Sequence, residues 1–306
     1  MTRGFITLAT GSDIYYRMAY NLLRSFRLFD KNTPFAILCD RENEYTKEFS
    51  DAIILENVTN SYLDKFRLLT DAPYDENIFI EPDCLVYHDL RHFWDLLSGK
   101  YDFTTFGWDD HSLIFFSDPE YAMTKFLGSS DALVSMFNPG YLFIRNGDVC
   151  TKIYADAMRI IEEIKADPKL KDDPEIMCKG CIRDDPVFYL AMSKNECRCA
   201  QHPDTGKCIS LYGIKKIRNI SLSRGRLDAS WWNYELTDCN ILHFSTRRTI
   251  EEGLYSQQVL VLNRLSKGKN DLLTRALESR FCFIAIDLYK KTKNRIVKRL
   301  KPARKA

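Results

Sequence analysis

Apolar residues in the first hundred positions alternate between short continuous runs and helical spacing. The runs at 5–10, 35–39, 52–55 and 77–80 are typical of buried strands. Between the first two, apolar side chains recur every three or four residues from Tyr16 to Phe26, and Gly11-Ser12-Asp13 supplies a turn and a helix N-cap. Helical patterns also cover 62–69 and 90–97. This alternation predicts an α/β fold with a mostly parallel sheet, helices on both faces and a ligand crevice at the strand ends.

The second half of the chain is more mixed. Strands are predicted at 101–106, 141–144 and 240–242, an amphipathic helix at 153–164, and a long helical pattern from Glu251 into a basic tail. A polar breaker region at 167–174 leads into a cysteine-rich stretch with little periodicity. We therefore expect a main domain at 1–250, with 167–210 as an insertion or cap, and a helical, basic C-terminal extension at 251–306.

Composition and charge narrow the class of protein. A chain of 306 residues, 45% hydrophobic and 28% charged, suits one large α/β domain or two small ones. A net charge of +2 gives no reason to expect a nucleic-acid partner. No charged start followed by an apolar stretch opens the chain, and the apolar run at 281–289 is interrupted by Asp287 and is shorter than the roughly 20 residues of a membrane span. We expect a cytoplasmic protein without a transmembrane helix.

Ten cysteines in a reducing compartment remain thiols or bind metal. Cys178, Cys181, Cys197 and Cys199, with His202 and Cys208 close by, have the density of a structural zinc site, although the second pair is spaced more tightly than usual. Scattered core thiols are the alternative.

The acidic sequence Glu81-Pro82-Asp83 follows directly after the strand at 77–80. Ligands of open α/β sheets bind beyond the carboxyl ends of strands, and Pro82 stiffens the turn that carries the two carboxylates. Hard oxygen ligands suit Mg²⁺ or Mn²⁺, which usually complete their coordination with substrate phosphates. The alternative is an ordinary acidic turn before the next helix.

Several segments together resemble the glycosyltransferase family 8 group that contains glycogenin and bacterial lipooligosaccharide galactosyltransferases. They are residues 6–15, the Glu81-Pro82-Asp83 motif, Asn138-Pro139-Gly140 with the strand after it, Asp184-Asp185-Pro186-Val187, and His243 at the end of a late strand. The resemblance covers roughly the first 250 residues. It implies a GT-A type nucleotide-sugar-binding fold.

The resemblance also implies roles for single residues. Leu8, Ala9, Thr10, Asp13 and Tyr15 would bind the uridine, and Lys65 the donor's phosphates or sugar. Glu81, Asp83 and His243 would hold the metal, with Pro82 between the two acids. Asn138, Gly140, Asp184 and Asp185 would contact the donor sugar, and Arg247 or Arg248 the phosphates. Each role has a structural alternative: Tyr15 only packs the first helix, Lys65 is a surface lysine, Gly140 only forms a turn, and His243 is structural.

Three features depart from the family pattern. Glu81 stands where the metal motif usually begins with aspartate, and Asp185 stands where glutamine is usual. The segment after His243 lacks the family's glycine, lysine and Pro-Trp. The first departure keeps the ligand type but changes its reach.

The function implied by this resemblance is metal-dependent transfer of a hexose from a UDP-sugar to a glycan or lipid-linked acceptor, with retention at the anomeric carbon. A catalytically silent relative that acts as a binding protein is the first alternative. A sugar nucleotidyltransferase is the second, but no glycine-rich pyrophosphate loop with a basic residue follows the first strand.

Nine lysines and arginines between 290 and 305 follow the apolar stretch at 281–286. A basic amphipathic end of this kind favours peripheral attachment to the anionic inner face of the cell membrane. A solvated tail is the alternative.

Overall fold

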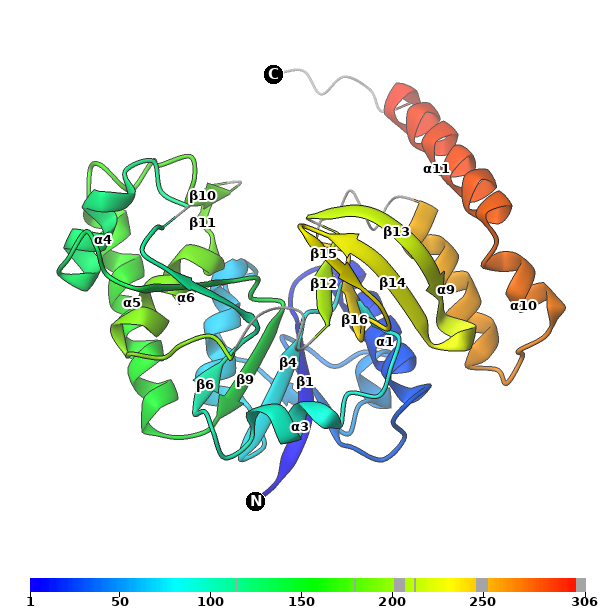
Figure 1. The fold of residues 1–306 in the computed structure, drawn as a ribbon, viewed down its shortest axis with the longest axis horizontal. Helices are drawn as coiled ribbons and strands as arrows, with labels where there is room; N and C mark the ends of the chain where they lie inside the picture. Colours follow the sequence, from blue (N-terminus) through cyan, green and yellow to red (C-terminus); the bar gives the residue numbers. More distant parts are fainter. Residues whose placement is uncertain (114, 179, 201–206, 212, 246–252, 301–306) are drawn as a thin grey trace. The chain divides into compact units, whose positions relative to one another are not determined.

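The computed structural model describes residues 1–113, 115–178, 180–200, 207–211, 213–245 and 253–300 (Figure 1). The chain forms two compact units that interleave along the sequence. Unit 1 comprises Met1–Tyr20, Asn32–Pro82 and Leu90–Gly206, and unit 2 comprises Asn21–Lys31, Asp83–Asp89 and Lys207–Ala306.

Unit 1 is built on a six-stranded sheet in the order β3-β2-β1-β4-β9-β6. Its strands are β1 (Arg3–Ala9), β2 (Phe35–Cys39), β3 (Asp51–Ile54), β4 (Glu76–Ile80), β6 (Phe103–Thr104) and β9 (Tyr141–Arg145). The first four in that order are parallel, and β9 is antiparallel to both β4 and β6. The predicted mostly parallel sheet is confirmed, with each strand placed within two or three residues of its predicted position.

Helices cover both faces of this sheet. Successive residues of β1 point to opposite sides, and since the neighbours Phe5 and Ile6 are both buried, both faces are apolar and need cover. Ile6 belongs to the main core, which also contains buried residues of α5 (Asp148–Ala166) and α6 (Asp184–Lys194). On the other face Phe5 packs against Trp94 of α3 (His92–Leu97), with ring centroids 5.4 Å apart. Helix α1 (Asp13–Arg27) begins in unit 1 and continues into unit 2. The predicted layers are therefore confirmed.

Shorter elements complete unit 1. They are the 3₁₀ helices η1 (Thr46–Glu48) and η2 (Tyr62–Arg67), helices α2 (Leu68–Asp71) and α4 (Pro119–Leu127), the antiparallel pair β7 (Gly107–Asp110) and β8 (Val134–Phe137), and the small pair β10 (Met177–Cys178) and β11 (Cys181–Ile182). The predicted helix at 62–69 is thus η2 followed by one turn of α2.

Helix α6 lies within the stretch that the sequence marks as an insertion or cap, but its side chains join the main core. Residues 186–193 are all buried. A helix that is buried on every side shows no amphipathic period, which explains why the sequence pattern gives no sign of it.

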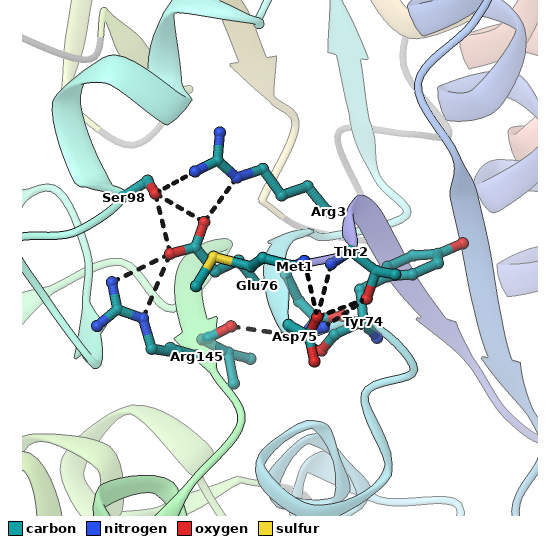
Figure 2. Close-up of polar contacts among 10 residues, drawn as sticks. Met1, Thr2, Arg3, Tyr74, Asp75, Glu76, Ser98 and Arg145 are labelled. Carbon is teal, nitrogen blue, oxygen red and sulfur yellow. Dashed lines mark hydrogen bonds and ion pairs between the residues drawn. The ribbon is translucent and has the colours of Figure 1, made fainter.

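The N-terminal ends of β1 and β4 are held by an ion-pair cluster (Figure 2). Glu76 is fully buried and accepts hydrogen bonds from Arg3, Arg145 and Ser98. Burial alone would raise the pKa of Glu76, but the hydrogen bonds from Ser98 and Arg145 and the charge of Arg3 outweigh it and lower this pKa. The cluster is structural. It ties β1, β4 and β9 together at the edge of the sheet that lies opposite the carboxyl ends of β1 and β4.

Unit 2 contains two three-stranded sheets. One has the order β12-β16-β5, with β12 (Cys208–Ser210) parallel and β5 (Cys84–Val86) antiparallel to β16 (Ile241–His243). The other is an antiparallel meander of β13 (Ile214–Ser221), β14 (Arg226–Trp231) and β15 (Tyr234–Leu236), with the 3₁₀ helix η3 (Leu222–Arg224) between its first two strands. The strand predicted at 240–242 is confirmed as β16.

The helical C-terminal pattern corresponds to three helices: α9 (Gly253–Leu265), α10 (Leu272–Leu277) and α11 (Arg280–Leu300). The break after α9 falls where Gly268 adopts φ +71° and Asp271 caps α10 by accepting from the Thr274 N–H. None of the helices in the described ranges carries an apolar stretch that could traverse a lipid bilayer.

Candidate functional site

The loop after β1 is held by carboxylates from two other elements. Thr10 Oγ1 donates to Asp64 of η2 at 3.1 Å, and the Gly11 N–H donates to Asp40, just after β2, at 3.2 Å. Gly11 has φ +74°, and a Cβ at this position would lie 2.8 Å from Asn60 Oδ1. Only glycine fits both conditions, so the loop has one preferred conformation.

The two tyrosines at the start of α1 have different environments. Tyr16 is fully buried and its hydroxyl donates to Asp40 Oδ1, and burial together with that carboxylate raises the pKa of Tyr16. Tyr15 is 45% exposed. Of the residues assigned to the uridine, Leu8 is half-buried and Ala9 is buried in β1, while Asp13 pairs with Arg41 at 2.6 Å. Tyr15 is therefore the aromatic ring that remains accessible to a base.

Lys65 lies in a buried cluster rather than on the surface. Its ammonium group forms ion pairs with Glu81, which follows β4, and with Asp184, the first residue of α6. Burial opposes the charge on Lys65, but the two carboxylates outweigh it and raise its pKa. The lysine stays charged, and it links the carboxyl end of β4 to the start of α6.

Asp185 is the largely buried neighbour of this cluster. Arg183 Nε donates to Asp185 Oδ1 at 3.0 Å, and the guanidinium stacks on the Phe115 ring with its carbon 4.6 Å from the ring centroid. Burial and the charge of Asp184 raise the pKa of Asp185 to about 6, although Arg183 opposes the shift. This carboxyl group therefore changes its protonation state just below neutral pH.

Asn138 and Gly140 lie in the turn that begins β9. The Asn138 side-chain oxygen accepts from the Gly140 N–H at 2.9 Å, and the Gly140 carbonyl accepts from the Glu81 N–H at 2.9 Å. The turn is thus joined to the residue that leads the acidic motif. Asn138 is half-buried.

Asp83 and His243 come together in unit 2 although 160 residues separate them in the sequence. Asp83 directly precedes β5, and His243 is the last residue of β16, in register with Cys84. His243 Nε2 lies 3.0 Å from Asp83 Oδ1, and both side chains are largely buried. Ligand atoms of Asp83, Cys84 and His243 all lie within 4.8 Å of one another. A carboxylate and an imidazole suit Mn²⁺ or Mg²⁺ better than the Cys84 thiol does.

The remaining assignments have different outcomes. Glu81 belongs to unit 1, where it pairs with Lys65, whereas Asp83 and His243 belong to unit 2. Their joint role as ligands of one ion stays a prediction, and so does the role of Pro82 between the two acids. Arg247 and Arg248 lie outside the described residues.

Within the described part of the chain, the four cysteines of the expected zinc site do not form a group of metal ligands. Cys178 and Cys181 face each other across β10 and β11, while the Cys197 thiol donates to the Asn195 carbonyl and the Cys199 thiol to the Met136 carbonyl. The structure therefore does not support the zinc prediction. His202 lies outside the described residues.

Sequence reasoning missed four residues that shape the site: Asp40, Arg41, Asp64 and Arg183. Asp40 could have been found, because it is a polar residue immediately after a buried strand of the predicted sheet. Arg41 and Asp64 carry no local signal, since their partners in the loop after β1 are distant in sequence. Arg183 lies only two residues before its partner Asp185, so that pair could have been found as well.

The fold is of the GT-A glycosyltransferase type. Among solved structures, the chain is similar to the apo structure of the bifunctional glycosyltransferase WbbM, with a TM-score of 0.51, 12% identity, and coverage of 82% of this chain and 47% of that one. The chain thus spans about half the length of that protein.

Two further structures score lower. The galactosyltransferase LgtC, solved with donor and acceptor sugar analogs, has a TM-score of 0.49, 13% identity, and coverage of 88% of this chain and 97% of that one. Mouse xyloside xylosyltransferase 1 has a TM-score of 0.45 and 10% identity, over 80% of this chain and 98% of that one. A scan against protein-family models finds no match, and a comparison with curated proteins finds none either.

Proposed function

We propose that this protein is a metal-dependent glycosyltransferase that moves a hexose from a UDP-sugar to a glycan or lipid-linked saccharide. The observation that carries the proposal is the meeting of Asp83 and His243 at the ends of β5 and β16, in a chain with a GT-A fold. A buried carboxylate beside a buried imidazole is a chemically sound start for a divalent cation site, which phosphate oxygens of a donor would complete.

Asp83 and His243 are the proposed metal ligands, and Glu81 is a third candidate. A divalent ion bound there would offset the negative charge that develops on the leaving diphosphate. The oxygen and nitrogen of the pair are ligand types that Mn²⁺ and Mg²⁺ accept, and both residues lie at the same end of the β5–β16 strand pair.

The uridine would bind at the loop after β1. Tyr15 offers an accessible ring for stacking, which is worth about 1 to 3 kcal/mol for a nucleic-acid base on an aromatic side chain. The backbone of Leu8, Ala9 and Thr10 would supply hydrogen bonds to the base, and Asp13 to the nucleoside.

The donor sugar would lie against Lys65, Asp184 and Asp185, with Asn138 and Gly140 at its edge. Carboxylates held in ion pairs with Lys65 and Arg183 are fixed acceptors for sugar hydroxyl groups, because the ion pairs restrict their rotamers. We propose retention: the acceptor oxygen bonds to the anomeric carbon as the bond from that carbon to the diphosphate oxygen breaks. The electron pair leaves with UDP, and a phosphate oxygen takes the acceptor's proton.

One observation favours a second candidate, a catalytically silent relative that binds a partner. Glu81, the first acid of the expected metal motif, already forms an ion pair with Lys65. Metal-dependent hydrolysis of UDP-sugar without acceptor separates the two candidates, because a silent protein would release no UDP.

We also propose that α10 and α11 attach the enzyme to an anionic membrane surface, where a lipid-linked acceptor would be found. The exposed face of α11 is apolar over two turns: Phe281, Ile284, Leu288 and Tyr289 are all exposed. Leu272 and Leu273 of α10 are exposed as well. Lysines and arginines follow along the chain from Lys290. This combination is typical of helices that lie in the headgroup region.

The test of the proposed function is UDP release from a panel of UDP-sugars with MnCl₂, comparing wild type with Asp83→Asn. The substitution keeps the shape of the side chain but removes its charge, so we expect at least a 100-fold loss of turnover. Mn²⁺-dependent thermal stabilisation by UDP should disappear as well, with the fold intact by circular dichroism.

Asp172→Asn is the matched control, because Asp172 is an exposed aspartate of unit 1. It should behave as wild type. Full activity in Asp83→Asn would remove Asp83 from the metal site, and wild-type protein that neither binds UDP nor releases it from any donor would reject the function.

A further inference from the structure

Arg41 is the residue in which the contacts of the loop after β1 converge. It directly follows Asp40, which itself follows the buried strand β2. Its guanidinium donates to the Gly11 carbonyl at 2.9 Å, to Asp13 Oδ1 at 2.6 Å and to Asp40 Oδ2 at 3.1 Å. One side chain therefore joins the loop, the start of α1 and the end of β2.

The arrangement is reciprocal. Asp40 accepts from the Gly11 N–H and from the Tyr16 hydroxyl, while the Arg41 N–H donates back to that hydroxyl at 3.2 Å. The guanidinium also stacks over the Tyr16 ring, 4.7 Å from its centroid. Both the N–H and the carbonyl of Gly11 are thus bound by the two adjacent residues that follow β2, so the loop cannot rotate without breaking charged hydrogen bonds.

Arginine is suited to this task and lysine is not. A guanidinium presents several N–H groups in a fixed plane and can reach the carbonyl and two carboxylates at once, whereas an ammonium is a point charge on a flexible stem. Arg41 is partly exposed, yet its guanidinium is bound by the loop after β1 and by the residues that hold this loop.

We propose that Arg41 is a positioning residue for the donor nucleotide: it fixes the Gly11–Asp13 turn so that Tyr15 and the backbone of residues 8–10 face the base. This inference rests on the proposed function, because it assumes that the loop binds uridine. It adds that nucleotide affinity depends on a residue that does not touch the donor. The expected signature is a loss of donor binding with little change in the chemical step.

The experiment measures UDP binding by isothermal titration calorimetry in MnCl₂, together with donor kinetics, for wild type, Arg41→Met and Arg41→Lys. We expect Arg41→Met to raise the Kd for UDP and the KM for the donor at least 10-fold, with kcat within about 3-fold of wild type. Arg41→Lys should fall between the two. The KM for the acceptor should not change.

Arg159→Met is the matched control. Arg159, on α5, bonds to Asp156 at 2.7 Å and to Glu163 at 3.4 Å and is about as exposed as Arg41, but it lies outside the loop. It should leave UDP binding unchanged. A double-mutant cycle with Asp13→Asn adds a readout that general destabilisation would not give: the effects of Arg41→Met and Asp13→Asn on the Kd should be less than multiplicative.

The two proposals fail in different ways. If wild type binds UDP and Arg41→Met binds it equally well, the role of Arg41 is rejected and the proposed function stands. If Arg41→Met lowers kcat as much as it raises KM, the residue belongs to the chemistry and the positioning role is rejected. If wild type binds no UDP, the proposed function is rejected and this inference with it.

Discussion

At the scale of single residues, the candidate site is defined by how buried charges are paired. Lys65 forms ion pairs with two carboxylates, and Arg183 holds a third. The sequence pointed to Glu81, Asp184 and Asp185 because they follow predicted strands or match a known pattern. It could not reveal that Glu81 pairs with Lys65, since ion pairs between residues 16 positions apart leave no periodic signal. Pairing is decided by the fold.

The raised pKa of Asp185 predicts that the contribution of this residue to the stability of the folded protein falls as the pH rises. Its pKa rises from 3.8 to about 6 because the folded protein buries it beside Asp184. Between these pH values the folded state therefore binds more protons at Asp185 than the unfolded state does. The stability that the protonated form contributes is fully present below pH 3.8, and it is lost as the pH rises through 6. The total change is at most about 3 kcal/mol.

Urea denaturation of wild type and Asp185→Asn at several pH values from 4 to 7.5 checks this. The difference in unfolding free energy, wild type minus variant, should fall as pH rises. Asp167→Asn is the control: hydrogen bonds from Lys125 and Tyr121 lower the pKa of Asp167 from 3.8 to about 2, so its contribution is lost only below about pH 4, and the difference for this variant should stay nearly constant over the range measured. A difference for Asp185→Asn that does not vary with pH would contradict the assignment.

At the scale of elements, the predictable parts of the fold are those whose pattern is simple. The strands β1, β2 and β4 are continuous apolar runs, and α1 and α5 are amphipathic, so all five were predicted. Helix α6 was not, because it is buried on every side. The meander of β13 to β15 was missed too, since β13 is mostly polar and has irregular register with β14. Patterns fail where burial is uniform or register is broken.

Gly11 tests whether the loop after β1 acts as a fixed element. Gly11 and Gly99 both have φ +74°, but a Cβ at Gly11 would lie 2.8 Å from Asn60 Oδ1, whereas nothing lies within 4 Å of one at Gly99. Alanine at either position should cost about 1 to 2 kcal/mol of unfolding free energy for the left-handed backbone. Only Gly11→Ala must also displace Asn60.

We therefore expect Gly11→Ala to be the more destabilised variant in urea denaturation and to lose UDP affinity at least 10-fold by calorimetry. Gly99→Ala should keep wild-type affinity despite its lower stability. Equal UDP affinity in the two alanine variants would mean that the conformation of the loop is not needed for the nucleotide.

At the scale of the whole molecule, the chain divides in a way that a linear reading could not foresee. The sequence suggests one main domain to residue 250 and an extension after it, a boundary that stays a prediction. The two compact units interleave along the chain: Asn21–Lys31 and Asp83–Asp89 join the C-terminal unit. The Glu81-Pro82-Asp83 motif marks one of these transitions: Pro82 ends a segment of unit 1 and Asp83 begins one of unit 2.

Attachment of the whole protein to a membrane is the last property that the structure lets us predict. We expect wild type to sediment with vesicles that contain phosphatidylglycerol, and not with pure phosphatidylcholine, because each basic residue near an anionic surface contributes about 1 kcal/mol. Phe281→Ser with Leu288→Ser removes two exposed apolar side chains from α11 and should reduce binding at least 5-fold with little loss of stability, since neither side chain is buried.

Ile54→Ser is the control, because Ile54 is an exposed apolar residue of β3 in unit 1, and this variant should bind vesicles as wild type does. High salt should weaken binding of wild type as well. Equal binding by wild type and the double variant would show that the apolar face of α11 has another role.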